Sequence, residues 1–328
     1  MSIGRRDSAP SLFDEIRAAA AEVTRRARDV RIDEERLDAF ADGLAAAPIA
    51  YEDLDPMHDF VGELERALAF TIALDAINFG SGWFPVLRKR AGLSGYRSIA
   101  TACRESVLAG DPWDGAWLRA ATPDSMARLL GQALGDPEVA ELMTLYAQAW
   151  RELGEWLERR HGDRFDAVVA SAGRSAERLV RMLAELPLYR DVARYDELDV
   201  PFYKRAQITA ADLARVFAGE GPGAFDDLDA LTLFADNLVP HVLRCHGVLA
   251  YSDALAARIE AETLLAVGSR PEVEIRAVAL EAVERLVRGL AARGCRTTAH
   301  ALDGRLWNAG QAAWIKARPR HRARCPYY

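Results

Sequence analysis

Apolar residues recur at steps of three and four positions through most of the chain, and Ala, Leu, Glu and Arg are common between them. This spacing places apolar side chains on one helix face, and these four residue types have high helix propensity. The pattern predicts a mainly α, compact multi-helix fold with at most minor β structure. The predicted helices cover residues 11–29, 32–47, 59–78, 122–134, 137–160, 165–186, 209–218, 226–247, 252–265, 271–293 and 298–316.

Several predicted helices have recognisable first residues. Thr122 stands before a proline, Ser252 stands before an aspartate, and Thr209 is followed three positions later by an aspartate. A side-chain oxygen at the start of a helix accepts a hydrogen bond from a backbone amide that otherwise has no partner. We therefore expect helices to begin at these three residues. Pro240 lies inside the predicted helix 226–247, so we expect a kink or a break there.

Four segments lack the helical pattern. Loops on a rigid scaffold are where binding and catalytic residues usually lie, so these segments are the first places to look for chemistry. Residues 195–203 can hold a short strand, which Pro201 would confine to a sheet edge. The non-helical segments are 80–96, 189–203, 219–225 and the tail from Pro319.

The composition fits a folded protein with a large core. Half of the 328 residues are apolar and 28% are charged, which allows a single domain over residues 1–328 or two closely packed helical lobes. The formal net charge is −7. This balance counts against a protein that captures long nucleic acid by neutralising many phosphates, but it is compatible with a small anionic ligand.

The chain shows no pattern of export, membrane insertion or common cofactor binding. The first residues contain two arginines without a following apolar run, and no later stretch is long and apolar enough to span a bilayer. The four cysteines are scattered without a C-x-x-C pair, which is typical of free thiols in a reducing cytoplasm. His241, Cys245 and His246 lack the spacing of a metal site, so no metal is expected.

Three residues near the end of one predicted helix have the composition of a purine site. Asp75, Asn78 and Phe79 lie at i, i+3 and i+4, so their side chains share one face. A carboxylate can accept hydrogen bonds from N1 and N2 of a guanine-like base, an amide can donate to O6, and an aromatic ring can stack. The alternative is an ordinary helix C-terminus with a solvated acid and glycines in their usual place.

Two charged residues stand among aromatic or apolar neighbours. Lys204 lies between Tyr203 and Arg205, and a solvated surface pair of cations is the simplest interpretation. Asp236 lies in the apolar stretch 231–239, where a buried carboxylate without a partner would cost free energy. Asp236 therefore has a partner or a chemical role, or else it lies on the polar face of its helix. The pattern alone leaves both interpretations open.

The last ten residues are basic and end in two tyrosines. His321, Arg322 and Arg324 are concentrated there in an otherwise acidic chain. Arginine and histidine bind phosphate through charge-assisted hydrogen bonds. The cluster predicts either a phosphate site or a frayed basic terminus.

Taken in order along the chain, these segments resemble the queuosine salvage protein family, the queuosine 5′-phosphate N-glycosidases. No single segment is diagnostic, whereas the ordered set with its terminal tyrosine pair is highly specific. One departure is Gly80-Ser81-Gly82, which predicts a more flexible loop than in members with bulkier residues there. The matching segments are DAINF (75–79), GYRS (95–98), YRDV (189–192), FYKRAQI (202–208), FAD (234–236), YSD (251–253), EVEIR (272–276) and the ending 321–328.

The resemblance implies a mainly helical fold comparable to the helix-hairpin-helix DNA glycosylases. It also implies hydrolysis of queuosine 5′-phosphate to queuine and ribose 5-phosphate, without a metal or organic cofactor. The expected partner is a small nucleotide, not a stable nucleic-acid complex or a membrane. In the family's motifs a lysine and an aspartate form the catalytic pair, and the corresponding residues here are Lys204 and Asp236.

The chemistry of the implied substrate explains why such a pair is needed. A 7-deazapurine lacks N7, so protonation at that position cannot make it a better leaving group. A carboxylate near C1′ can instead stabilise an oxocarbenium-like sugar, add to it or activate water. We expect Asp236 to be that carboxylate and Lys204 to favour its ionised form. The implied ligand contacts are Asp75, Asn78 and Phe79 for the base, Asp303 as a further polar contact, and His321 and Arg322 for the phosphate.

Two other functions stay open on the sequence alone. A glycosylase that acts on a base within DNA or RNA fits the fold comparison, but a polymer-binding enzyme should have a basic stripe that this acidic chain lacks. A non-catalytic carrier of queuine or its nucleotide would bind the ligand without releasing a base.

Overall fold

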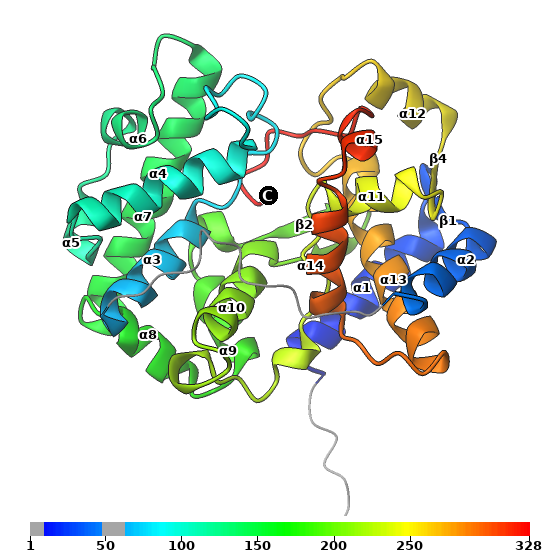
Figure 1. The fold of residues 1–328 in the computed structure, drawn as a ribbon, viewed down its shortest axis with the longest axis horizontal. Helices are drawn as coiled ribbons and strands as arrows, with labels where there is room; N and C mark the ends of the chain where they lie inside the picture. The colour runs from blue at the N-terminus through cyan, green and yellow to red at the C-terminus, as the bar shows by residue number, and fades with distance from the viewer. Residues whose placement is uncertain (1–9, 48–62) are drawn as a thin grey trace, which may run out of the picture.

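The computed structural model describes residues 10–47 and 63–328, and helices dominate it (Figure 1). The predicted mainly helical class is confirmed. None of the helices in these two ranges combines the length and apolar character needed to cross a bilayer. The α-helices are α1 (Leu12–Arg26), α2 (Glu34–Ala45), α3 (Leu64–Ala76), α4 (Gly95–Ala109), α5 (Gly115–Arg119), α6 (Pro123–Leu129), α7 (Pro137–His161), α8 (Phe165–Ala172), α9 (Ala176–Leu183), α10 (Lys204–Val216), α11 (Val239–Cys245), α12 (Asp253–Glu260), α13 (Arg270–Ala292), α14 (Ala299–Ala309) and α15 (Ala313–Lys316).

Short 3₁₀ helices and strands complete the described elements. The strands form two antiparallel pairs, β1 with β4 and β2 with β3. Val192 pairs with Pro201 at one end of the second pair, so the strand expected within residues 195–203 is present and ends at its proline. These elements are η1 (Pro187–Tyr189), η2 (Gly221–Gly223), η3 (Leu228–Ala230), β1 (Val30–Ile32), β2 (Val192–Tyr195), β3 (Leu198–Pro201) and β4 (Leu249–Tyr251).

The helices gather in two halves (Figure 1). In the α7 half, which contains α3 to α10, the long helix α7 packs on α3, α5, α6 and α8. In the α13 half, which contains α1, α2 and α11 to α15, helix α13 packs on α1, α2, α11 and α14. One cluster of buried apolar side chains continues through both halves. The organisation of residues 1–328 as a single domain stays a prediction.

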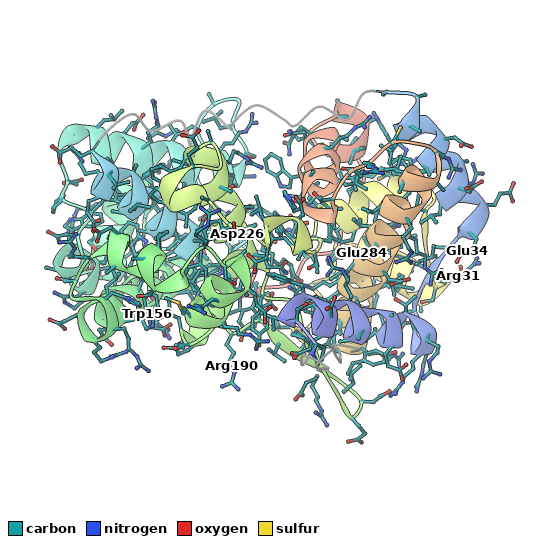
Figure 2. All side chains as sticks on the ribbon, turned by 90° about the horizontal axis from the view of Figure 1, so that it is seen from below. Arg31, Glu34, Trp156, Arg190, Asp226 and Glu284 are labelled. Carbon is teal, nitrogen blue, oxygen red and sulfur yellow. The ribbon has the colours of Figure 1, made fainter. Side chains whose placement is uncertain are left out.

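Helix α13 is the centre of its half because its apolar residues occur almost all around it. Val273, Val278, Val283 and Leu286 are fully buried, as expected for a helix that is covered on several sides. Glu284 of α13 lies against α1 (Figure 2), where its carboxylate pairs with Arg17 at 3.0 Å. Helices from opposite ends of the sequence are thereby joined.

The structure confirms some predicted helix boundaries and contradicts others. Thr122 and Ser252 cap α6 and α12 as expected, and Pro240 lies in the first turn of α11. Thr209 was wrongly predicted as a helix start, because it lies inside α10. The predicted helix 226–247 was also wrong over its first part, since only η3 and α11 are helical there.

Candidate active site

A cavity of about 810 Å³ lies between the two halves. Its wall combines the end of α3, the segment that leads into α4, and parts of α10, α14 and the C-terminal tail, together with the segment before α11. This volume is in the range of sites for small organic ligands. A nucleotide fits such a space.

Asp236 lies on the cavity wall in the non-helical segment before α11. One carboxylate oxygen accepts hydrogen bonds from the backbone amides of Leu238, at 2.7 Å, and Val239, at 3.0 Å. The side chain therefore caps the first turn of α11, where unpaired amides stabilise negative charge. Because both bonds use the same oxygen, the second oxygen is available to a ligand. Asp236 thus has both a structural partner and access to the cavity.

Lys204 is the first residue of α10 and lies on the same wall. Its ammonium group donates a hydrogen bond to the backbone carbonyl of Asn78 at 3.2 Å. Burial lowers the pKa of Lys204, while Asp236 acts in the opposite direction and favours the charged form. The two residues that the resemblance paired are thus brought to one cavity from separate elements.

Asp303 of α14 is a buried acid on the wall near Asp236. Its Oδ1 accepts a hydrogen bond from the Phe234 amide at 3.1 Å. Burial and, next, the Asp236 carboxylate raise the pKa of Asp303 well above its ordinary value. A neutral carboxyl group beside a charged one can donate a proton while its neighbour stabilises positive charge.

The three residues predicted to read a base are not equivalent in the structure. Asn78 and Phe79 line the cavity, whereas Asp75 is fully buried in α3 and lies behind the wall. Burial, followed by Asp212, raises the pKa of Asp75 well above its ordinary value and favours its neutral form. The ring of Phe79 packs under the Arg205 guanidinium at 4.7 Å. Little of that ring is left for a ligand, because Phe79 is only 2% exposed.

A second acid near Asp75 does lie on the cavity wall. Asp212 lines the cavity and pairs with Arg215 at 3.3 Å. In the sequence, Asp212 is the aspartate three positions after Thr209, and we expected it only to help start a helix. The available signal was the helical spacing of Lys204, Ile208, Asp212 and Arg215, which all line the cavity.

Two aromatic side chains from opposite halves meet at the cavity. Tyr96 of α4 and Trp307 of α14 lie edge to face, with ring centroids 6.4 Å apart. Trp307 follows Asp303 by four positions, so both point from the same face of α14. Sequence reasoning gave neither aromatic residue a role, although Tyr96 belongs to the GYRS segment.

The C-terminal tail supplies cations to the wall. Arg320 and Arg322 line the cavity, and Arg322 also donates a hydrogen bond to the backbone carbonyl of Glu262 at 3.3 Å. His321, the other predicted phosphate contact, is buried and is not part of the wall. Burial lowers the pKa of His321 to about 3, so its ring is neutral. The structure thus brings Arg322, but not the His321 ring, to the cavity.

The Gly80-Ser81-Gly82 loop is packed against this tail. The Gly80 amide donates a hydrogen bond to a main-chain oxygen of Tyr328 at 3.0 Å. A Cβ atom at Gly82 would collide with the backbone carbonyl group of Ala323. Trp83, which follows this loop, donates a hydrogen bond from its indole N–H to Glu141 at 2.8 Å. The small residue at position 82 therefore provides room for the tail.

The cavity wall has an excess of basic side chains in an acidic chain. Such a local excess favours an anionic ligand. Within residues 10–47 and 63–328, no group of three or more His, Cys, Asp or Glu side chains is arranged to hold a metal ion. The basic wall residues are Lys89, Arg97, Lys204, Arg215, Lys316, Arg318, Arg320 and Arg322, and the acidic ones are Asp212, Asp236, Glu262 and Asp303.

Comparison with known families agrees with this arrangement. The family described as "Queuosine salvage protein" matches residues 57–328. The chain belongs to the queuosine salvage protein family. The match covers every element from α3 to the C-terminal tail, and so it includes all of the cavity wall.

Queuosine salvage relatives align with nearly the whole chain. A protein of Sphaerobacter thermophilus named queuosine 5′-phosphate N-glycosylase/hydrolase is 36% identical over 311 residues, which is 93% of this chain and 95% of the relative. Proteins with the same name from Mus musculus and Bos taurus are 31% and 30% identical, and each alignment covers 95% of this chain and 98% of the relative. The family resemblance inferred from the ordered segments is confirmed.

Proposed function

We propose that this protein hydrolyses the N-glycosidic bond of queuosine 5′-phosphate and releases queuine and ribose 5-phosphate. The observation that carries the proposal is the convergence of Asp236, Asp303 and Lys204 from separate elements on one nucleotide-sized cavity. Relatives named for this activity align with almost the full chain. The protein is accordingly an N-glycoside hydrolase that acts on a small nucleotide.

Asp236 has the central role in the proposed reaction. As the bond from C1′ to the base breaks, positive charge develops on the sugar, and a carboxylate at C1′ stabilises it. The free oxygen of Asp236 is suited to this contact because its other oxygen is fixed by two backbone amides. Lys204 balances the charge of Asp236 and lies where it can contact the sugar or phosphate.

Asp303 is the proposed proton donor. The departing base carries the electron pair of the broken bond, and a proton on the base makes it a better leaving group. The neutral carboxyl group of Asp303 can supply that proton. Water then adds its hydroxyl group to C1′, and the remaining proton of that water returns to the acid.

A direct assay tests the proposed function. The protein is incubated with queuosine 5′-phosphate, and queuine and ribose 5-phosphate are measured by mass spectrometry. Equal amounts of the two products should appear. Binding of the nucleotide without either product would instead support a carrier, and release of a base only from RNA or DNA would support a polymer glycosylase.

We propose that Asn78 and Asp212 contact the guanine-like edge of the base, with Tyr96 and Trp307 as nearby apolar surface. Asp212→Asn should weaken queuine binding by about 10- to 100-fold, since a hydrogen bond to a charged group contributes about 1.5–3 kcal/mol. Isothermal titration with queuine measures this. Asp199→Asn, at an exposed aspartate of β3, is the matched control. Equal affinity of both variants and wild type would show that the base lies elsewhere.

We propose that Arg320 and Arg322 bind the 5′-phosphate. Arg320→Ala should lower kcat/KM for the monophosphate by about 10- to 100-fold through loss of a charge-assisted hydrogen bond, while turnover of the nucleoside changes little. Activity with both substrates is compared. Arg31→Ala removes an exposed arginine at the outer edge of the α13 half and serves as the control (Figure 2). An unchanged preference for the monophosphate in Arg320→Ala would exclude Arg320.

We also propose a cytoplasmic location, because the four cysteines are scattered along the chain without a C-x-x-C pair. All four are free thiols in the structure. This proposal does not depend on the identity of the substrate.

A further inference from the structure

A buried arginine outside the cavity contacts the backbone next to Asp236. Arg276, in the second turn of α13, is 1% exposed and is not part of the cavity wall. Its Nε donates a hydrogen bond to the carbonyl oxygen of Ala235 at 2.9 Å. Since Ala235 directly precedes Asp236, this bond fixes the peptide that carries the proposed catalytic carboxylate.

The other end of the same guanidinium is paired with Asp191. Nη1 and Nη2 of Arg276 donate to the two carboxylate oxygens of Asp191 at 3.0 and 2.6 Å. Burial opposes the charge, but Asp191 and Glu272 raise the pKa of Arg276 above its ordinary value. The planar fork of an arginine can satisfy a carboxylate and a carbonyl at once, which the single ammonium of a lysine cannot do in the same geometry.

Asp191 in turn holds the start of α10. One of its carboxylate oxygens accepts a hydrogen bond from the Lys204 amide at 3.2 Å. Its backbone carbonyl accepts from the Phe202 and Tyr203 amides at 2.9 and 3.2 Å. Tyr203, at the N-cap, has a left-handed φ of 47° and provides no side-chain cap of its own. Asp191 therefore supplies the hydrogen bonds that define where Lys204 begins its helix.

Aromatic rings fix the plane of the guanidinium. It lies 3.9 Å from the ring centroid of Phe202 and 4.7 Å from that of Tyr328. The Tyr328 hydroxyl donates to Glu272 at 2.8 Å. These contacts restrict the rotation of Arg276, and they tie the tail to the same group.

We propose that Arg276 and Asp191 are positioning residues that hold Lys204 and Asp236 in one fixed relation across the two halves. The inference rests on the proposed function, because Arg276 and Asp191 touch no substrate and act only through Lys204 and Asp236. Segment 231–238 has no regular structure of its own, so the place of Asp236 depends on such long-range bonds. A displacement of about 1 Å in a catalytic group can lower a rate about 100-fold.

Arg276→Lys tests this inference, because it keeps the positive charge but not the three-bond geometry. Its kcat for release of queuine from queuosine 5′-phosphate should fall about 100-fold, while KM changes little, since the base and phosphate contacts are separate residues. Asp191→Asn keeps the shape of the partner and should lower kcat in the same way. Thermal unfolding and circular dichroism establish that each variant is folded.

Arg119→Lys is the matched control. Arg119 also donates to both oxygens of an aspartate, Asp163, at 2.8 and 3.1 Å, and to a backbone carbonyl, that of Gly154, at 3.0 Å. It lies in the α7 half and does not line the cavity, so kcat should stay at the wild-type value.

The possible outcomes distinguish a failure of the proposed function from a failure of the positioning inference. If wild type releases no queuine, the proposed function fails. If wild type is active and the folded Arg276→Lys and Asp191→Asn proteins keep its kcat, as Arg119→Lys does, the positioning inference is overturned. Unfolding of both Arg276→Lys and Asp191→Asn would also overturn it, because the pair would then serve stability.

Discussion

Asp236→Asn should reduce the release of queuine from queuosine 5′-phosphate by about 1000-fold while the fold is retained. Asparagine keeps the side-chain oxygen that accepts from the Leu238 and Val239 amides, so α11 still begins at the same place. It removes the negative charge that faces C1′ in the proposed transition state. A 1000-fold loss corresponds to about 4 kcal/mol. Single-turnover measurement of released queuine checks this expectation.

Asp114→Asn is the control for the structural part of that change. Asp114 caps α5 through a hydrogen bond from the Trp117 amide at 2.8 Å, and it does not line the cavity. The control should keep wild-type turnover. Near-normal turnover by a folded Asp236→Asn protein would remove Asp236 from the mechanism.

Asp303→Asn should lower kcat by about 100-fold, in the range lost when a general acid is removed. The raised pKa of Asp303 means that its carboxyl group holds a proton at pH values where an ordinary aspartate is charged. Activity that needs this proton is present below the raised pKa and is lost as the pH increases through it. The alkaline decline of kcat in wild type should therefore be absent from the residual activity of Asp303→Asn.

Complete pH profiles of kcat test whether Asp303 supplies the proton. Asp114→Asn should show the same alkaline decline as wild type, since its side chain is remote from the cavity. An Asp303→Asn protein with the wild-type profile and rate would show that the proton comes from another group.

Local patterns predicted helices well where the helix carries its own start signal. Thr122 and Ser252 cap their helices with their own side chains, so the sequence contains the information. The start of α10 was misplaced at Thr209 because the capping carboxylate, that of Asp191, stands 13 positions before Lys204. No local spacing rule includes such a distant partner.

The segment before α11 is a case in which the local pattern predicted a helix that the structure lacks. Its apolar residues gave a helical pattern, yet the backbone from 231 to 238 is held in a non-helical form by distant side chains. Gln207 accepts a hydrogen bond from the Thr232 amide, Asp303 accepts from Phe234, and Arg276 donates to Ala235. Tertiary hydrogen bonds outweigh helix propensity here.

The candidate site was predicted mainly through the ordered family segments. These directed attention to Lys204 and Asp236, and both side chains line one cavity together with Asp303, which lies outside those segments. Access to the cavity could not be predicted in the same way, since Asp75 and Asp212 both lie inside helices but only Asp212 lines the cavity. The prediction placed a base contact at Asp75, and we propose Asp212 for this contact because its side chain lines the cavity.

The pairing of α1 with α13 has a consequence during synthesis. Phe13, Ile16 and Val23 of α1 are buried in the structure, and α13 is the helix on which α1 mainly packs. Roughly 240 residues separate the end of α1 from the start of α13, and at about 5–20 residues per second a ribosome needs on the order of 10–50 s to make them. The apolar face of α1 is therefore without its main helical partner during this interval.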